Sequence, residues 1–503
     1  MLGSRVSCAA TLIAAAASSI VAQTAPTHGV RPKHLIIRNV MIVDGNGTPA
    51  KGPANVTVDG NIIGTIQYLR QGGVPGQRHY GADTVEIDGT GKYLLPGLIN
   101  AHGHLQSNRA GHSLDGYDYN LKLWLANGIT TVREVGSESD SGIIAIRGKS
   151  ARGEIVAPRI YAYPMFGRPN IHSPADARAR VQELKKLGVD GIKILGIERD
   201  LMAAMEDEAH KVGLPIAHHV GVEETNVWDD IKFGTRSIEH WYGIPDAAIP
   251  DGRQNFPSAY NYQNESDRFR WAGRLWREAD PKLLDSVLTS MVRANVAWVP
   301  TLDIYEASRD LQRAQNQPWF KDYLHPSLEW YFKPDLNNHG SYFIGWSSTD
   351  EVYWKENYQI WMSALRDFER KGGLIGCGDD AGFIYELYGF ALIREMELHQ
   401  EAGFQTLKII QHCTGNNAKI LGVDDKLGRI RTGWLADLIV VDGNPLENLK
   451  FLYAGGTSGM KDGKEIHTDG SEWVIKDGIT YSGPQLLREV KAIVDKAKAR
   501  SAP

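Results

Sequence analysis

The chain has 503 residues, of which 42% are hydrophobic and 23% charged, with a formal net charge of -5. This length suits one large catalytic domain with a minor one, and the composition is that of a soluble globular protein. The slightly acidic balance offers no basic field for nucleic acid, so the expected partner is a small molecule.

The first 22 residues have the pattern of a secretory signal peptide. Arg5 provides a cationic start, an apolar run extends from about Cys8 to Val21, and the small Ala22 precedes a polar stretch. The run is shorter than the roughly 20 apolar residues of a bilayer-spanning helix. We therefore expect residues 1–22 to be removed and the protein to be exported, periplasmic or secreted, without stable membrane association. A retained N-terminal helix is the alternative.

Cysteines are sparse in this chain. Of the three, Cys8 would leave with the signal peptide, and Cys377 and Cys413 remain. Two cysteines are no disulfide framework, so we expect the stability of the fold to come from its hydrophobic core.

Both ends of the mature chain have the pattern of short β-strands. Residues 34–95 hold alternating segments punctuated by Asp-Gly and Asn-Gly pairs, which mark tight turns between antiparallel strands. A similar texture returns in residues 425–483, and residues 484–503 are typical of a surface helix with a short tail. We predict that the two ends meet in one small accessory β-sandwich domain.

Residues 96–424 alternate short apolar runs with longer helical patterns, which indicates βα units around a parallel sheet. Eight strands can be placed: LLPGLINAHGHL, ITTVREVG, RIYAYP, GIKIL, PIAHHV, SIEHW, AWVPTL and LIGCGDDA. Eight is the number that closes a barrel. The predicted fold class is therefore α/β, a catalytic (β/α)8 TIM barrel with an insertion around residues 242–350 and the accessory β-sandwich.

The insertion and the stretch after PTL are rich in aromatic residues. They are Tyr260, Tyr262, Trp271, Trp276, Trp319, Phe320, Trp330, Tyr331, Tyr342 and Trp346. Loops on this face of a barrel border the active site, so these rings could line an aromatic-accepting pocket. Alternatively, they pack the helices of the insertion or a contact in the homo-oligomer that we expect.

Metal-binding residue types stand at the carboxyl ends of the predicted strands, which converge on one face of a parallel barrel. His102 and His104, two residues apart on the first strand, point the same way. Lys193, His219, His240 and Asp380 belong to the fourth, fifth, sixth and eighth strands. Imidazole and carboxylate together suit zinc. Lys193 lies in an apolar run, where burial would lower its pKa and leave a reactive neutral amine; a plain structural lysine is the alternative.

Five segments in this order, PGLINAHGHL, DGIKIL, PIAHHVG, SIEHW and GDDAG, resemble the strand-end motifs of the amidohydrolase superfamily. The similarity is greatest to its imidazolonepropionase-related and metal-dependent dipeptidase-like branch. The stretch NNAKILGVDDKLGRIRTGWLADLIVVDGNP resembles the exit from that barrel into the accessory sheet, so the resemblance covers nearly the whole mature chain. It implies two divalent cations, with zinc favoured, and a CO2-derived carbamate on Lys193 that bridges them. The ligand set that it implies is His102, His104, Lys193, His219, His240 and Asp380.

Two positions leave a choice. His218 and His219 are adjacent and point to opposite sides of a strand. The spacing from Pro215 in the family pattern favours His219, which places His218 at the barrel wall or near the substrate. The family usually has Thr or Ser where GDDAG has Asp379; the position before Ala-Gly favours Asp380 as the ligand. Asp379 is then interpreted as a solvated loop acid or a helix N-cap.

The resemblance implies a metal-dependent hydrolase. Asp380 would take a proton from a metal-bridging water, and the hydroxide would attack the amide carbonyl of a small peptide or N-acyl amino acid. Tyr242 and Arg109 are candidate substrate contacts, whereas Arg133 resembles an arginine of the family that is more often structural. The alternatives are a cyclic amidohydrolase or a deaminase, which Lys193 disfavours, a lactone or ester hydrolase, and a non-enzymatic binding protein that would have lost ligands.

Overall fold

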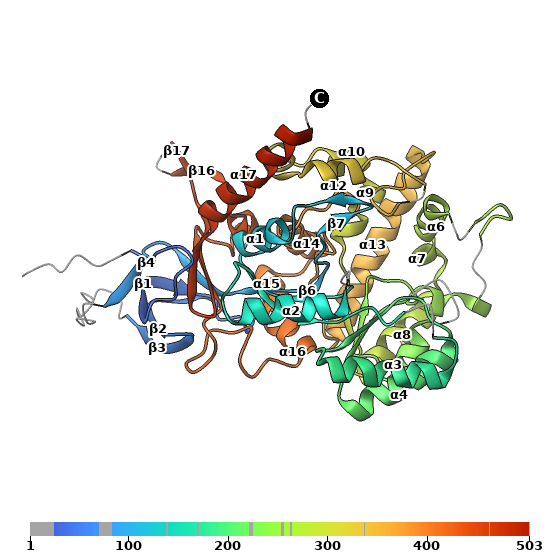
Figure 1. The fold of residues 1–503 in the computed structure, drawn as a ribbon. Coiled ribbons are helices and arrows are strands. Elements are labelled where there is room, and N and C mark those ends of the chain that lie inside the picture. Colours follow the sequence, from blue (N-terminus) through green and yellow to red (C-terminus); the bar gives the residue numbers. More distant parts are fainter. Residues whose placement is uncertain are drawn as a thin grey trace, which may run out of the picture.

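The structure is a computed structural model, shown in Figure 1. It describes residues 25–69, 83–136, 139–167, 171–220, 225–252, 256–261, 264–336, 338–461 and 463–501. The expected signal peptide at residues 1–22 lies outside the described residues. Within them, no helix combines the length and the apolar character needed to cross a membrane.

Strands from both ends of the chain form one eight-stranded sheet in the order β19-β18-β15-β5-β1-β2-β3, with β4 paired to β1. Their bounds are β1 His34–Ile42, β2 Lys51–Asp59, β3 Ile62–Tyr68, β4 Thr84–Asp88, β5 Tyr93–Pro96, β15 Leu438–Asp442, β18 Gly470–Lys476 and β19 Ile479–Ser482. The two ends meet where β5 and β15 pair antiparallel, with Leu438 opposite Pro96. The division into two facing sheets of a sandwich stays a prediction.

The core of this sheet is built from apolar side chains of strands at both ends of the chain. Leu35 and Ile37 of β1 are buried and pack in one cluster with Val56 of β2 and with Val440 and Ile475 from the far end of the chain. Burying side chains of this kind contributes about 1.5–3 kcal/mol each, so the distant segments are held together by apolar contact as well as by strand pairing.

The middle of the chain forms two parallel sheets, β10-β9-β6 and β11-β12-β13-β14. The bounds are β6 Leu98–Gly103, β9 Ile129–Glu134, β10 Arg159–Ala162, β11 Ile192–Ile194, β12 Ile216–His219, β13 Ser237–Glu239 and β14 Ala297–Val299. They correspond to the first seven predicted strands. The eighth segment contains a single bridge, from Ile375 to Trp298, and no extended strand. Closure into one barrel therefore stays a prediction.

Helices follow most of these strands and cover the parallel sheets (Figure 1). They are α1 Asp118–Ala126, α2 Asp140–Ala151, α3 Pro174–Leu187, α4 Arg199–Val212, α5 Val227–Phe233, α8 Pro281–Arg293, α13 Ser348–Arg370, α14 Phe390–Glu401, α15 Thr406–Gln411 and α16 Asn417–Leu421. The signals for their ends are local: Ser173 accepts a hydrogen bond from the Asp176 amide at the start of α3, and Gly188 ends that helix in the left-handed region.

Shorter elements occupy the remaining described chain. Those between β13 and α13 are α6 Glu265–Ala272, α7 Leu275–Glu278, α9 Glu306–Arg309, α10 Leu311–Gln315, α11 Phe320–Tyr323, α12 Pro326–Tyr331 and the single turns η1 Asp246–Ala248, η2 Pro250–Gly252 and η3 Asp303–Tyr305. The others are hairpins β7 Asn108–Arg109 with β8 His112–Ser113 and β16 Ser458–Lys461 with β17 Lys464–His467, the short π-helix η4 His412–Asn416 and the 3-10 helix η5 Leu449–Leu452. The last helix, α17 Gly483–Ser501, packs against α1.

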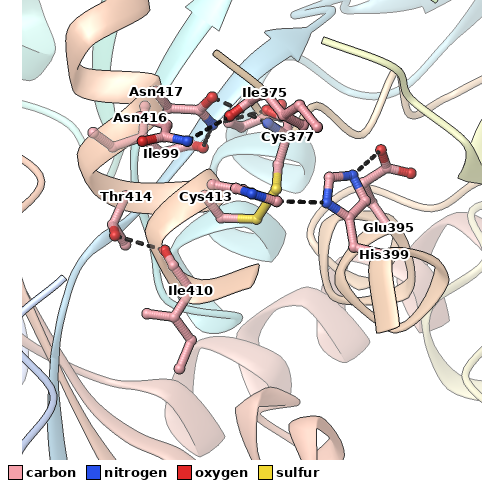
Figure 2. The surroundings of a disulfide bond; sticks show 12 residues. Ile99, Ile375, Cys377, Glu395, His399, Ile410, Cys413, Thr414, Asn416 and Asn417 are labelled. Carbon is pink, nitrogen blue, oxygen red and sulfur yellow. Dashed lines mark hydrogen bonds and ion pairs between the residues drawn. A yellow bond between two sulfur atoms is a disulfide. The ribbon is translucent and has the colours of Figure 1, made fainter. Parts of the chain in front are cut away.

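A disulfide joins Cys377 to Cys413 (Figure 2). This corrects the expectation that stability comes from the core alone. The two cysteines are 36 residues apart, and they meet because η4 packs beside the eighth segment, which no local pattern indicates. The Asn417 side chain reinforces this contact, since its oxygen accepts from the Cys377 amide at 3.0 Å and its nitrogen donates to the Cys377 carbonyl at 2.8 Å. The segment that leads to Asp380 is thus anchored to the helix behind it.

Candidate active site

A pocket of about 570 Å³ opens where the parallel strands end. Its lining includes Tyr242 and all six positions expected to hold metal. These positions are His102, His104, Lys193, His219, His240 and Asp380. We call these seven residues the inner wall. The structure thus brings together side chains that come from sequence-distant strands.

Asp380 lies at the centre of the inner wall. Its Oδ1 lies 2.9 Å from Nε2 of His104 and 3.6 Å from Nε2 of His102, and its Oδ2 lies 3.7 Å from Nε2 of His240. Ligand atoms of His102, His240 and Asp380 all fall within 4.8 Å of one another. Three imidazole nitrogens therefore face one carboxylate, an arrangement that suits a divalent cation.

Two of these residues depend on an unusual backbone. His240 has φ 63° and Asp380 has φ 40°, a left-handed conformation that costs a residue other than glycine about 1–3 kcal/mol. Neighbouring strands hold both turns, because the His240 amide donates to the Val299 carbonyl and the Asp380 amide donates to the His102 carbonyl, each at 2.9 Å. The fold thus maintains strain where the side chains enter the pocket.

Hydrogen bonds behind the inner wall orient its imidazoles. Nδ1 of His102 lies 2.6 Å from Oε2 of Glu239, and Nδ1 of His240 lies 2.6 Å from Oγ1 of Thr301. Contacts of this kind at Nδ1 leave Nε2 to meet a metal. Glu239 is fully buried and also accepts from Nη2 of Arg133 at 2.6 Å, so Arg133 supports the site from behind. The sequence analysis missed Glu239, although it lies within SIEHW.

Lys193 is 1% exposed, and its Nζ has no hydrogen-bond partner among the described residues. Burial lowers the pKa of this amine to about 8, although the nearby Glu239 and Asp380 oppose the shift. A buried polar atom without a partner is energetically costly. The neutral amine predicted from the sequence is consistent with this environment.

The remaining imidazole of the inner wall belongs to His219. Its ring centre lies 4.4 Å from that of His240 and 5.5 Å from that of Tyr242, on which it stacks. Burial lowers the pKa values of His102, His219 and His240 well below 6.5, which favours the neutral imidazole that a metal requires.

His218 and Arg109, the other candidate substrate contacts, do not belong to the described lining of the pocket. Nδ1 of His218 lies 2.7 Å from Oδ1 of Asp230, on the side of β12 opposite to His219. Arg109 donates to the Tyr388 hydroxyl at 2.9 Å, and its guanidinium lies 4.1 Å from the centre of the Phe383 ring. Direct substrate contact by His218 or Arg109 stays a prediction.

The interpretation of Asp379 as a solvated loop acid or a helix N-cap is wrong. The side chain is fully buried and accepts hydrogen bonds from Nδ2 of Asn100 at 2.7 Å and from Nε1 of Trp124 at 2.8 Å. Burial raises the pKa of Asp379 to about 6, against the opposing effect of these two donors. Asp379 thus anchors the start of the turn that presents Asp380.

Other lining residues of the pocket were missed by the sequence analysis. They are Glu265, Arg268 and Phe269 of α6, with His339 and Phe383, and we call them the outer wall. None of the described insertion aromatics singled out from the sequence belongs to the lining, and Trp276 and Tyr342 are buried in the core instead. Their packing role is the alternative that the structure favours.

Comparison with known proteins assigns the family. The amidohydrolase family model matches residues 93–252 and 359–466, just over half of the chain. No curated protein matches by sequence. A candidate prolidase from Bifidobacterium longum is a similar solved structure, with 23% identity, TM-score 0.62, and coverage of 93% of this chain and 100% of that one.

Two further solved structures share the fold. A Xaa-Pro dipeptidase with bound methionine has 22% identity, TM-score 0.61 and coverage of 89% and 100% of the two chains. A bottromycin amidohydrolase has 18% identity, TM-score 0.64 and coverage of 93% and 92%. The family match over most of the strand-bearing chain, together with the pocket that its strand ends line, shows that this protein belongs to the amidohydrolase family.

Proposed function

We propose that the protein is a metal-dependent hydrolase that cleaves the amide C–N bond of a small peptide or an N-acyl amino acid. The observation that carries this proposal is the inner wall, where imidazole nitrogens of His102, His104 and His240 surround the Asp380 carboxylate. Membership of the amidohydrolase family supports a hydrolase that acts on carbon–nitrogen bonds.

The inner wall contains a group of three residues, His102, His240 and Asp380, that could hold a metal ion, and we propose that the whole wall holds two divalent cations. We propose that His102, His104, Lys193, His219, His240 and Asp380 hold them. Neutral imidazole and carboxylate favour zinc among the available metals. When bound, such cations supply positive charge that activates water and polarises a carbonyl oxygen.

Lys193 completes this set as a carbamate in our proposal. The neutral amine bonds to the carbon of CO2 and releases one proton, which leaves an anionic oxygen ligand on a formerly unpartnered side chain. The pKa of about 8 supports the step, because an appreciable fraction of the amine is neutral near neutral pH. The absence of a hydrogen-bond partner for Nζ among the described residues supports it independently.

Asp380 moves the proton. Burial alone would raise its pKa, but His102 and His104 hold the pKa of Asp380 below its usual value, so this side chain starts as a carboxylate. We propose that it accepts a proton from the attacking water and returns that proton to the leaving nitrogen. We propose that Tyr242, which stacks on His219 and lines the pocket, contacts the substrate carbonyl.

The proposal includes a closed barrel as the fold of the catalytic domain and export of the protein. Backbone hydrogen bonds at both gaps between the parallel sheets support a closed barrel. The Phe166 amide donates to the Lys193 carbonyl at 2.7 Å, and the Ala101 amide donates to the Cys377 carbonyl at 2.9 Å. Export is supported by the Cys377–Cys413 bond, because disulfides persist in oxidising compartments.

The test measures metal content, carbamate and activity together. We expect about two zinc ions per chain, a ¹³C signal of the carbamate after exposure to ¹³CO2, and amidase activity that chelation removes and zinc restores. Lys193→Met should reduce the bound metal to one ion or none and abolish the ¹³C signal. Lys476→Met is the matched control, because this second buried lysine donates to the Ser150 carbonyl outside the pocket. Unchanged metal content in Lys193→Met would overturn the proposed ligand set.

A further inference from the structure

A second hollow of about 350 Å³ adjoins the active-site pocket. Met165, Leu195 and Gly196 line both, and we call the second hollow the extension. All three lie beside Lys193, and Met165 pairs with it through a parallel bridge. The extension therefore lies next to the part of the inner wall that holds Lys193.

Most of the described residues that line the extension are apolar. Phe166, Ile171, Ile194, Ile197 and Leu201 line it beyond the junction. Of its described lining residues, Glu198 alone carries a charge, and this side chain is exposed at the start of α4. Leu195 is 46% exposed at the junction, an uncommon degree of exposure for a large apolar side chain next to a catalytic pocket. Such a surface gains free energy when an apolar group covers it.

The outer wall offers charge instead. Glu265 Oε1 accepts from Nη2 of Arg268 at 2.6 Å, and Nδ1 of His339 lies 3.1 Å from Glu265 Oε2. Both carboxylate oxygens of Glu265 therefore face side-chain nitrogens within the wall. Glu265 and Arg268 thus form an ion pair at the pocket wall, and the planar donors of the Arg268 guanidinium match a carboxylate.

We propose that the substrate is an amino acid with an apolar N-acyl chain: the chain occupies the extension beyond Met165 and Leu195, and the carboxylate binds Arg268. This inference rests on the proposed amide hydrolysis and specifies its substrate class. The scissile bond then lies at the inner wall, between the two ends. A dipeptide fits less well, because its ammonium group would enter the apolar extension.

The test uses the full zinc-loaded chain and three substrates, N-acetyl-, N-butanoyl- and N-octanoylglycine. A buried methylene contributes about 0.8 kcal/mol, so kcat/KM should rise by about fourfold for each methylene that the extension covers. We expect N-octanoylglycine to exceed N-acetylglycine by on the order of 100-fold or more. Equal rates for the three substrates, or a faster reaction when the chain ends in an amine that pairs with Glu198, would overturn the apolar assignment.

Two variants separate the ends of the substrate. Leu195→Asp should reduce the ratio of octanoyl to acetyl rates by at least about tenfold, whereas Leu283→Asp, at an equally exposed leucine of α8, should leave that ratio unchanged. Arg268→Gln should reduce the preference for N-octanoylglycine over N-octanoylglycinamide by about 10- to 100-fold. Arg277→Gln, at an exposed arginine of α7, is its control. An unchanged carboxylate preference in Arg268→Gln would overturn that contact.

Binding measured without turnover keeps this inference distinct from the proposed function. Calorimetric titration of the metal-free protein with N-octanoylglycine and N-acetylglycine reports the extension alone. If the longer ligand binds more tightly but the zinc-loaded protein releases no octanoate, the substrate-class inference stands as a ligand assignment and amide hydrolysis fails. If amides are cleaved without dependence on chain length or carboxylate, hydrolysis stands and the inference fails.

Discussion

The two walls of the pocket differ in how they are built. The inner wall comes from the ends of parallel strands, and its central side chains, such as His102, Lys193 and His240, are about 1% exposed. The outer wall comes from α6 and from the separate segments that hold His339 and Phe383, and the Arg268, Glu265 and His339 side chains are 24%, 23% and 37% exposed. In the proposed function, the buried strand ends carry the reaction, and the partly exposed outer wall discriminates between ligands.

Asp380→Asn should produce the largest effect, because the amide cannot take up the proton that the reaction moves. We expect kcat/KM to fall by at least about 10³-fold, within the range for loss of a general acid–base group. Metal content is measured on the same sample to separate proton transfer from metal loss. Asp495→Asn, on the exposed face of α17, is the control. A fall in kcat/KM of less than tenfold would show that Asp380 does not transfer the proton. The inner wall would then lack the catalytic role that distinguishes it from the outer wall.

A buried carboxyl group near the inner wall should make the stability of the protein depend on pH. Glu206 of α4 accepts from Oγ1 of Thr235 at 2.7 Å, and burial raises the pKa of Glu206 to about 8. Negative charge on Asp230 adds to this rise. Asp230 in turn contacts His218, which lies in β12 next to His219 of the inner wall. Glu206 therefore keeps its proton in the folded state at a pH where an unfolded chain has released it.

The sign of the stability effect follows from linkage. The stabilising contribution of protonated Glu206 is fully present below its usual pKa of 4.5 and is lost as pH rises to about 8. Within that window this group should lower the free energy of unfolding by about 1.4 kcal/mol per pH unit. Glu206→Gln should flatten the profile, measured by urea unfolding at several pH values. An identical pH profile in Glu206→Gln and wild type would show that this carboxyl is ionised in the fold.

Asp379→Ala tests how the inner wall is held in place, because it removes a side chain that anchors the turn before Asp380 rather than a proposed metal ligand. Two buried donors, on Asn100 and Trp124, would lose their acceptor, at a cost of about 1–3 kcal/mol each. We expect thermal unfolding to shift down and kcat to fall as Asp380 loses its orientation. Asp379→Asn retains part of the hydrogen bonding and should recover part of both losses. Full activity and stability in Asp379→Ala would return this residue to the role of a loop acid.

The inner wall was predictable because parallel topology alone brings strand ends together. His102 and His104 on one strand, and His240 and Asp380 at the ends of others, needed only the order of strands to share a site. The match of residues 93–252 and 359–466 to the amidohydrolase family agrees with that reading of the motifs.

What the sequence did not reveal depends on contacts between segments whose relative placement no periodicity specifies. Asp379 resembles a solvated acid until Trp124 of α1 is found against it. Glu265 and Arg268 lie on a short helix of the insertion, whose position over the pocket is set by tertiary packing. The Cys377–Cys413 pairing likewise requires η4 to lie beside the eighth segment. Sequence patterns encode strand ends directly, whereas loops and anchors require the folded chain.

Glu265→Gln should produce the smallest change in stability and thereby test the outer wall. Ion pairs between partly exposed side chains contribute about 0–1 kcal/mol, so the free energy of unfolding should change by less than about 1 kcal/mol. The loss should fall on substrate binding instead: without its carboxylate partner Arg268 is less well oriented, and KM for a carboxylate-bearing substrate should rise several-fold while kcat is nearly unchanged. Steady-state kinetics beside denaturant unfolding measures both quantities. A collapse of kcat with constant KM would mean that the outer wall takes part in the reaction itself, because a residue that only holds a binding group alters affinity before it alters chemistry.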